Sequence, residues 1–237
     1  MLGIVVALPD ESLSLCPKRI PIGQSLALSP RIQVRVAGMG PSRAQAAAED
    51  LYRAGARALL SWGCAAALES GLAAGTLLLP QGFVFPHGRI SFLADLGWWS
   101  HLHRILAGVR PLVTAPLAGS DRVLATLAHK RALHKATGAA AADMESAFLA
   151  GWAAERRLPF LAVRAIADTA TTPVPKAILT ADDGRGGISL PKLGLGLLRQ
   201  PRQIKEAIAL GRKFRAAHAR LAQAAQCLLP QGFGLPC

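Results

Sequence analysis

Short apolar runs that each end in a polar or glycine-rich turn constrain the fold of this chain more than any other feature. Residues 2–8, 58–61 and 158–166 form such runs, and segments of helical composition separate them. Runs of this length suit strands buried on both faces, as in parallel sheets. Strands that alternate with helices predict an α/β fold: a single domain with a central mixed, mainly parallel β-sheet flanked by helices.

Length and composition favour one well-packed domain. The chain has 237 residues, of which 51% are hydrophobic and only 5% aromatic, enough for one core. No apolar run is long and uncharged enough for a transmembrane helix. The first eight residues lack the basic flank and cleavage site of an export signal, so we expect a cytoplasmic protein. Four cysteines and six histidines show no metal-ligand spacing, so we expect no metal.

Positive charge is concentrated near the C-terminus. The formal net charge is +13, and residues 184–237 contain nine Lys and Arg against one acid. We expect a basic helical segment over about residues 185–226, with its long helix from about residue 200. Such a segment favours an anionic partner, either nucleic acid, acidic lipid or phosphate. A solvated helix face in a generally basic protein explains the charge equally well.

The remaining elements follow from local patterns. We expect a helix over 41–54 that begins at Pro41, helices over 121–137 and 143–157 capped by Asp121 and Asp143, and an irregular segment over 82–99. Further strands are expected at residues 31–37, 76–79 and 111–117. Active sites of such sheets lie at the carboxyl ends of strands. The turns at 9–11, 38–40, 63–65 and 168–169 should therefore share one edge.

Two carboxylates at strand ends are candidates for acid–base chemistry. Glu11 follows the first strand, where it could act as a general base or orient a water, or merely cap the next element. Asp168 ends the run 158–166, where burial could raise its pKa and let it protonate a leaving heterocycle. A cap on the following turn is the alternative for Asp168.

Other residues near these turns could bind a ligand. Glu145 could accept hydrogen bonds from a vicinal diol, with Met144 beneath the ligand, or could simply occupy the first turn of a helix. The helix start at Gly40 suits an anion or a ribose hydroxyl, and Arg43 lies in its first turn. Gly63 and Cys64 belong to a small-residue turn that a flat ligand could approach. No histidine stands at a spacing that would make Cys64 a nucleophile.

Five segments, in this order along the chain, resemble the purine nucleoside phosphorylase and methylthioadenosine/adenosylhomocysteine nucleosidase superfamily. The resemblance covers about residues 2–170. It implies one nucleoside phosphorylase-like domain over 1–237 and a homo-oligomer. The segments are Gly-Ile-Val-Val-Ala-Leu-Pro-Asp-Glu at 3–11, Gly-Met-Gly at 38–40, Ser-Trp-Gly-Cys-Ala-Ala-Ala-Leu at 61–68, Asp-Met-Glu-Ser at 143–146 and Arg-Ala-Ile-Ala-Asp at 164–168.

Within the superfamily, the chain looks most like the hopanoid-associated phosphorylases. The segments at 38–43, 142–146 and 183–185, the last before a basic helix, carry this likeness. It implies cleavage of the N-glycosidic bond of adenosylhopane in hopanoid biosynthesis, which releases adenine and leaves ribosylhopane or its phosphate. No cofactor is implied, and inorganic phosphate would be a co-substrate in a phosphorolysis.

The resemblance also assigns roles. Glu11 matches the acid that positions the attacking water, and Asp168 the residue that protonates purine N7. Met144 and Glu145 match the ribose platform and the acceptor of the 2′- and 3′-hydroxyls. Ser61 stands where bacterial purine phosphorylases place an arginine that binds phosphate. The nucleosidases also lack this arginine, and Arg43 is the candidate to replace it here.

A hopanoid substrate would need an apolar channel. Phe92, Trp98 and Trp99 could line one, as could residues 188–198, although loop packing also explains such aromatics. The basic segment suggests peripheral contact with anionic lipid at the inner face of the cytoplasmic membrane.

Three alternatives remain. Two have the same fold: a methylthioadenosine-type nucleosidase and a general purine phosphorylase. The third is a noncatalytic basic module that binds nucleic acid or membrane through residues 185–220. The aromatics of the chain are not interleaved with the basic run in the way that a single-strand platform would need, so no nucleic acid is expected.

Overall fold

The computed structural model describes residues 1–86, 90–181, 183–184, 186–187 and 189–235. In these residues eleven strands form one sheet. They are β1 Leu2–Val6, β2 Ser25–Ser29, β3 Ile32–Val36, β4 Ala58–Ala67, β5 Leu77–Leu78, β6 Gly82–Val84, β7 Ile90–Leu93, β8 Leu112–Val113, β9 Leu117–Gly119, β10 Ala141–Asp143 and β11 Phe160–Asp168.

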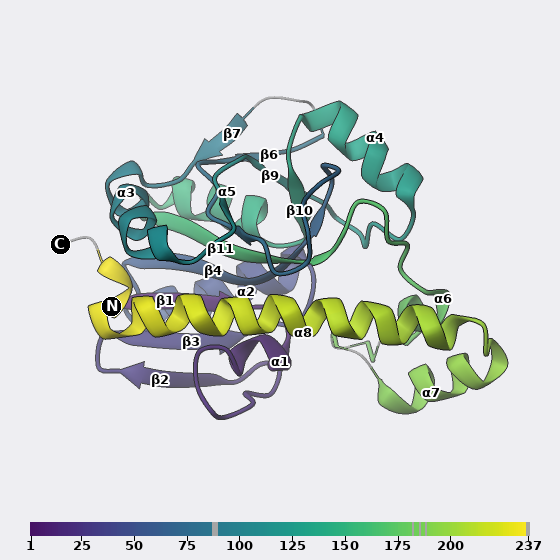
Figure 1. Cartoon of the computed structure of the whole chain (residues 1–237). Helices are drawn as coiled ribbons and strands as arrows, with labels where there is room; N and C mark the ends of the chain where they lie inside the picture. Colours follow the sequence, from purple (N-terminus) through teal and green to yellow (C-terminus); the bar gives the residue numbers. More distant parts are fainter. Residues whose placement is uncertain (87–89, 182, 185, 188, 236–237) are drawn as a thin grey trace.

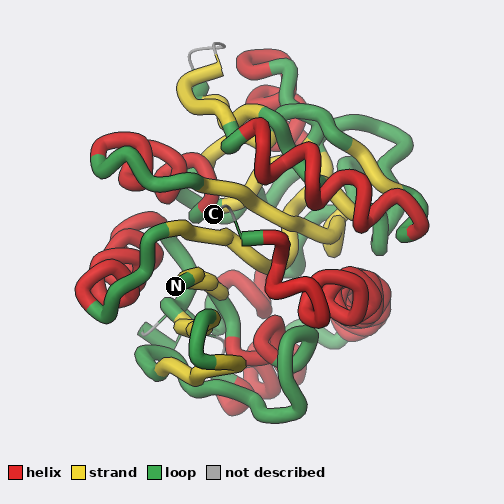
Figure 2. Tube along the Cα trace, turned by 90° about the vertical axis from the view of Figure 1, so that its left-hand side faces the viewer, coloured by secondary structure: helices red, strands yellow, loops and turns green. Residues whose placement is uncertain are grey.

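Helices cover both faces of this sheet, with α8 in front and α2 and α5 behind in the view of Figure 1. Figure 2 shows the same layers from the side, with strands between helices and α8 seen nearly along its axis. The predicted single α/β domain is confirmed. The helices are α1 Pro9–Ser12, α2 Pro41–Arg53, α3 Leu96–Ile105, α4 Leu127–Thr137, α5 Ser146–Glu155, α6 Lys176–Leu179, α7 Leu190–Arg199 and α8 Gln203–Leu228, with 3₁₀ turns η1 Leu106–Gly108 and η2 Leu229–Gly234.

Strand β4 is the centre of the sheet. It pairs in parallel with β1 and β11 and, near its carboxyl end, antiparallel with β10. Every residue of β1 and β11 is buried, as expected for apolar runs between two helical layers. The carboxyl ends of β1, β4 and β11 therefore meet at one edge, which is the edge that the turns in the sequence predict.

Some predicted boundaries are wrong. β4 runs on to Ala67 instead of ending at Gly63, because its last three residues carry only methyl groups and fit between β10 and β11. The segment 82–99 is expected to be irregular, but its described residues include β6, β7 and the start of α3, where the Asp95 side chain accepts a hydrogen bond from the Trp98 amide. Helix α4 begins at Leu127 with Thr126 as its cap, so Asp121 is not the cap.

Other differences lie at the edges of the fold. The predicted strand 111–117 is divided into β8 and β9, and the half-exposed strand β2 was not predicted. The expected basic helix extends over Gln203–Leu228, and a separate helix α7 precedes it. Ile188 and Arg185, which belong to predicted segments, lie outside the described residues. No helix in the described part of the chain is long and apolar enough to cross a membrane.

Candidate active site

Glu11 is held at the carboxyl ends of β1 and β4. Its Oε1 accepts a hydrogen bond from the Cys64 amide at 2.7 Å, and its Oε2 accepts one from the Leu8 amide at 3.0 Å. The side chain is 3% exposed. The Leu8 contact is the capping contact that the sequence allowed. The Cys64 contact brings residues 9–11 and 63–65 together, although 63–65 belong to β4 and do not form a turn.

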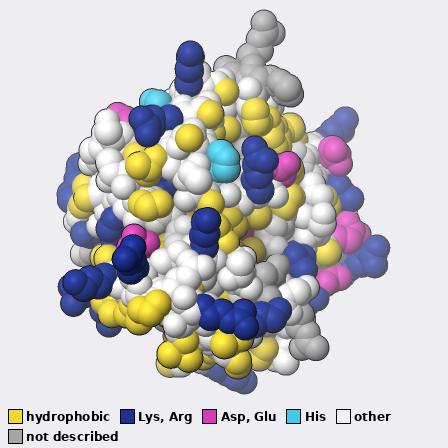
Figure 3. All heavy atoms as spheres, turned by 90° about the vertical axis from the view of Figure 1, so that its right-hand side faces the viewer, with side chains coloured by type: hydrophobic (Ala, Val, Ile, Leu, Met, Phe, Trp, Pro, Cys, Tyr) yellow, Lys and Arg dark blue, Asp and Glu magenta, His cyan; other side chains and the backbone are white. Residues whose placement is uncertain are grey.

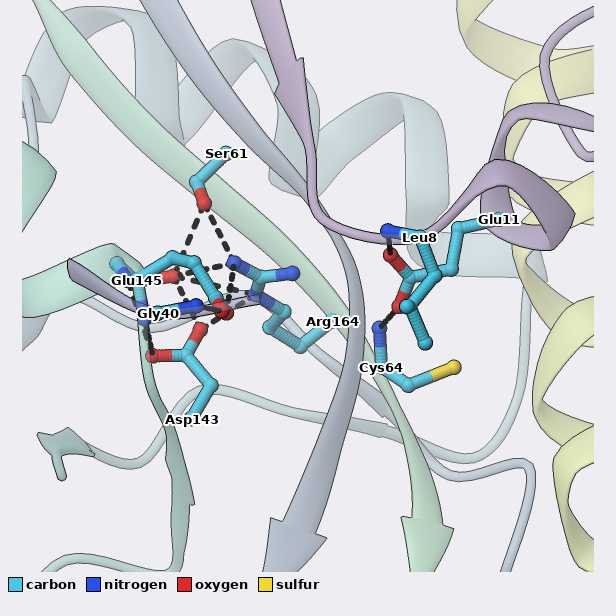
Figure 4. A network of polar contacts seen from close by, with 9 residues as sticks. Leu8, Glu11, Gly40, Ser61, Cys64, Asp143, Glu145 and Arg164 are labelled. Atoms are coloured by element: carbon cyan, nitrogen blue, oxygen red, sulfur yellow. Dashed lines mark hydrogen bonds and ion pairs between the residues drawn. The ribbon is translucent and has the colours of Figure 1, made fainter. Parts of the chain in front are cut away.

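Glu145 lies in the same region, at the junction of β10 and α5 (Figure 4). Its Oε1 accepts a hydrogen bond from the Gly40 amide at 2.9 Å, so this amide binds Glu145 and is not free for an anion. Burial, and then the neighbouring Asp143 carboxylate, raise the pKa of Glu145 to about 7. Glu145 therefore changes its charge near neutral pH. Met144, next to it, is half-buried.

Arg164 is the buried cation that connects these carboxylates. Its Nε lies 2.6 Å from Asp143 Oδ2, and its Nη2 lies 3.9 Å from Glu145 Oε2. The guanidinium also donates to the hydroxyls of Ser61 and Ser146. Burial acts to lower the pKa of Arg164, but Asp143, Glu145 and Glu11 outweigh it and raise the pKa. The arginine is charged at every physiological pH.

One nitrogen of this guanidinium is available for a ligand. In the described part of the chain, Arg164 Nη1 is buried without a hydrogen-bond partner. A Cβ on Gly63 would lie 2.6 Å from both Nη1 and Glu11 Oε1. The free N–H and the Glu11 carboxylate thus both lie close to Gly63, and only a residue without a side chain fits between them. Figure 4 shows Arg164 between the Glu145 and Glu11 groups.

Asp168 forms a second half of the site at the last position of β11. Its Oδ2 lies 2.7 Å from Nζ of Lys130 on α4, while its Oδ1 is buried with no hydrogen-bond partner among the described residues. Burial raises the pKa of Asp168, and Lys130 opposes that shift. Burial also lowers the pKa of Lys130. Both shifts favour a proton shared between the two groups.

Lys130 is itself fixed in position. It is fully buried, and its Nζ donates to the backbone carbonyls of Thr169 and Thr172, both at 2.8 Å. Lys213 of α8 donates to the hydroxyls of the same two threonines. The loop after β11 is therefore connected to α4 and α8 around Asp168.

Two further predicted residues have backbone or structural contacts. Cys64 contributes its amide to Glu11, and burial next to Glu11 raises the pKa of its thiol well above the usual value, which makes it a poor nucleophile. Arg43 donates to the Met39 and Gly184 carbonyls. Its guanidinium thus holds a loop, and it remains only a predicted anion ligand.

The structure does not bring the predicted channel aromatics together with the carboxylates. Trp98 is buried and donates to the Phe233 carbonyl, and Trp99 donates to the Leu79 carbonyl and stacks on His103. Phe92 packs edge-on against Phe85. Packing accounts for these contacts. The channel stays a prediction.

Cavities and metal ligands do not point to another centre. A surface cavity of about 920 Å³ lies beside Ile32, Trp98 and Gly234, and none of Glu11, Asp143, Glu145 and Asp168 lines it. No group of three or more His, Cys, Asp or Glu side chains in the described residues could hold a metal ion.

Arg164 and Lys130 were not predicted as separate site residues. For Arg164 a sign was present, because one arginine within a buried apolar strand needs buried partners. The helix that carries Lys130 contains two other basic residues, Arg131 and Lys135, and two histidines. Nothing local distinguishes Lys130 from them.

Comparisons with known proteins agree with the fold. A model of the phosphorylase superfamily matches residues 26–184, more than half of the chain. No curated protein matches the chain.

Solved structures of similar shape include the futalosine hydrolase of Helicobacter pylori strain 26695, at a TM-score of 0.71 and 15% identity, with 97% of each chain covered. An S-adenosylhomocysteine nucleosidase from Streptococcus pyogenes has a TM-score of 0.69 and 19% identity, covering 100% of this chain and 97% of its own. A 5′-methylthioadenosine/S-adenosylhomocysteine nucleosidase from S. pneumoniae gives 0.66 and 16%, covering 96% and 99%.

Proposed function

The chain belongs to the phosphorylase superfamily, and from this premise we propose that it hydrolyses the N-glycosidic bond of an adenine nucleoside that carries a hopanoid, adenosylhopane. Cleavage of an N-glycosidic bond is the general reaction of such an enzyme. The observation that carries the proposal is the arrangement of Glu11, Glu145 and Arg164, in which Glu11 and the unpartnered Arg164 Nη1 both lie close to Gly63.

The ribose half supplies the nucleophile and the diol contacts. Water bound between the two groups would donate to Glu11 and accept from the free Nη1 of Arg164. Glu145, as a carboxylate, would accept hydrogen bonds from the ribose hydroxyls. In the reaction the water oxygen bonds to C1′, and Glu11 receives its proton.

The base half supplies the proton for the leaving group. The C1′–N9 electron pair passes to adenine, which departs poorly as an anion. Asp168, with Oδ1 free and its pKa raised by burial, would donate a proton to N7, and Lys130 would hold the carboxyl in place. Adenosylhopane and water then give adenine and ribosylhopane.

The charge of the site favours water over phosphate. Asp143, Glu145 and Glu11 all act on a single guanidinium, so a phosphate dianion would meet an excess of carboxylate. Ser61 is buried and accepts from Arg164, and Arg43 is engaged with the 184 loop. The names of the structural neighbours, a hydrolase and two nucleosidases, agree with this choice.

The substrate rests on the likeness of residues 38–43, 142–146 and 183–185 to the hopanoid-associated group. The test is adenine release from adenosylhopane in detergent micelles, with and without phosphate, by the wild type and Asp168→Asn. We expect release that does not need phosphate and that Asp168→Asn reduces at least 100-fold, within the ~10²–10⁴-fold range of general acid catalysis.

The same experiment distinguishes the alternatives. Release only with phosphate would make the enzyme a phosphorylase. Faster release from methylthioadenosine or adenosine than from adenosylhopane would make it a nucleosidase or phosphorylase of soluble nucleosides. No release from any of the three would contradict the proposed reaction.

A further inference from the structure

Helix α7 and the start of α8 expose an unusual amount of apolar surface. Nine large apolar side chains are exposed among the described residues, and five of them lie between residues 190 and 208. The most exposed are Leu198 at 77% and Leu190 at 75%. The others are Leu195, Ile204 and Ile208. A concentration of exposed apolar side chains of this kind indicates an interaction site.

The way α7 is anchored explains why these leucines point outward. Gly196 lies against Ala177 of α6, where an added Cβ would be 3.2 Å from the alanine Cβ. None of the ten residues of α7 is buried, so its leucines contribute little to the apolar core.

Basic side chains surround the apolar ones. Arg199, Arg202 and Lys205 are exposed on and between the two helices. From residue 190 to the end of the chain, Glu206 is the only acid. Figure 3 shows this side of the molecule, with apolar groups in its lower part and Lys and Arg side chains next to them.

The surface lies beside the candidate active site. The Met39 amide donates to the Gly186 carbonyl at 2.8 Å, and Arg43 Nη2 donates to the Gly184 carbonyl at 2.9 Å. The next residue, Gly40, holds Glu145. The segment that leads into α7 is therefore attached to the turn that positions Glu145. α7 itself lies beyond residue 184, where the match to the superfamily ends.

We propose that α7 and the first two turns of α8 form a membrane-docking surface for an anionic lipid bilayer. Leu190, Leu195 and Leu198 enter the boundary between headgroups and acyl chains, and the arginines and lysine bind anionic headgroups. This is the behaviour of an interfacial amphipathic helix with a basic polar face. The surface does not depend on the identity of the substrate.

The chemistry of the surface favours a bilayer over other partners. A second copy of the chain would bring the same cationic groups against one another across the interface. A nucleic acid would satisfy the basic groups and leave the exposed leucines without a partner. Only an anionic lipid surface satisfies both kinds of side chain at once.

Vesicle co-sedimentation of the full-length protein tests this surface. The vesicles are pure phosphatidylcholine, or phosphatidylcholine with one third phosphatidylglycerol. We expect at least about tenfold stronger binding to the anionic vesicles, and weakening of that binding with rising salt. Leu195→Ser/Leu198→Ser should reduce it about tenfold or more, and Arg199→Gln/Arg202→Gln should reduce it toward the level on neutral vesicles.

Matched control variants distinguish binding through this surface from non-specific apolar or electrostatic binding. Leu93→Ser/Leu96→Ser removes two leucines of similar exposure elsewhere, and Arg104→Gln/Arg110→Gln removes two exposed arginines elsewhere. Both controls should bind like the wild type, and circular dichroism melting should show that every variant is folded.

Three outcomes would overturn the proposal. They are absence of binding to anionic vesicles by the wild type, equal loss in the controls, and dissociation of a wild-type oligomer by the α7 leucine variant in light scattering. The last result would assign the surface to a second copy. A failure of adenosylhopane cleavage would leave the vesicle result unaffected, because binding is measured without turnover.

Discussion

The carboxylate site and helix α7 are joined by a short loop, yet their side chains are in opposite physical states. In the site, Glu11, Glu145 and Arg164 are at most 5% exposed, and each has fixed partners. In α7 no residue is buried. Desolvation shifts the pKa values that the reaction needs, whereas docking needs apolar groups that remain in water until a membrane arrives. Substitutions in the site should therefore affect every substrate, and those in α7 only membrane-bound ones.

Glu11→Gln should produce the largest effect. The amide keeps the size of the side chain but cannot receive the proton of the attacking water, so we expect kcat to fall about 10³-fold on any nucleoside. Asp10→Asn is the matched control, because Asp10 is the neighbouring acid, half exposed and paired only with Arg19. Equal losses in soluble and lipid substrates are expected in steady-state kinetics. A loss of kcat on the lipid substrate alone would contradict the assignment of catalysis to the carboxylate site and of membrane contact to α7.

Gly63→Ala should come next. Its methyl group would lie 2.6 Å from Glu11 Oε1 and Arg164 Nη1, and the positive φ of 152° adds strain. We expect a loss of kcat of at least 100-fold, together with lower stability by about 1–3 kcal/mol in denaturant unfolding. Gly108→Ala, where an added Cβ meets nothing within 4 Å, should change neither. Near wild-type activity of Gly63→Ala would show that the reaction does not depend on the close approach of Glu11 and Arg164 to Gly63.

Lys130→Gln should alter the base half in a distinct way. Removal of the cation takes away the interaction that lowers the pKa of Asp168, so this pKa rises further. The alkaline limb of kcat/KM, where Asp168 loses its proton, should move to higher pH by about one unit. Buried Asp168 would lack its partner, and the free energy of unfolding near neutral pH should fall by about 3 kcal/mol.

Lys135→Gln, an exposed lysine on the same helix, controls for the loss of charge. It should leave both the pH profile and the stability as they are. An unchanged profile in Lys130→Gln would mean that the lysine supports only the loop after β11.

Glu145 should give the ribose half its own pH dependence. Its carboxylate form binds hydroxyls, and its pKa is about 7, so KM should fall as pH rises through about 7. Glu145→Gln should remove this dependence and raise KM at pH 8 by about tenfold.

The same pKa affects folding. Because the pKa in the folded state lies above the ordinary value of 4.5, the folded state binds this proton more tightly than the unfolded state does. The resulting contribution to stability is complete below about pH 4.5 and is lost as pH rises to about 7. Urea unfolding of the wild type and Glu145→Gln between pH 4.5 and 8 would reveal it as a difference in slope.

The smallest effect is expected from Leu195→Ser/Leu198→Ser away from lipid. Because both leucines are exposed, the free energy of unfolding should change by less than about 0.5 kcal/mol, and KM for soluble adenosine should stay the same. A loss of several kcal/mol would show that α7 packs into the fold and is not a docking element.

Much of the architecture could be predicted because its causes are local. The runs that became β1 and β11 are apolar at every position that a doubly covered strand buries, and Pro41 marks the start of α2. The turns of Glu11 and Gly40 lie at one edge because the parallel strands β1 and β3 end there together. Glu145 reaches the same region from β10, which runs antiparallel to β4.

The parts that could not be predicted depend on distant contacts. Lys130 becomes a partner of Asp168 only when α4 lies against the end of β11, and no pattern within α4 records this. The segment 82–99 appeared irregular, because its two short strands are stabilised by β9 and by each other. Arg164 was visible as a charge in an apolar strand, but its carboxylate neighbours come from two distant segments: Glu11 from one, and Asp143 and Glu145 from the other.

The hydrogen bonds from Met39 to Gly186 and from Arg43 to Gly184 have a consequence for evolution and for engineering. They are the described contacts between the catalytic edge and the segment that leads into α7, and one of them involves backbone atoms alone. A loop attached in this way can be replaced by one of another length or polarity while the strand ends keep their geometry. Selection, or a designer, can therefore change where the enzyme meets its substrate without rebuilding how it cleaves it.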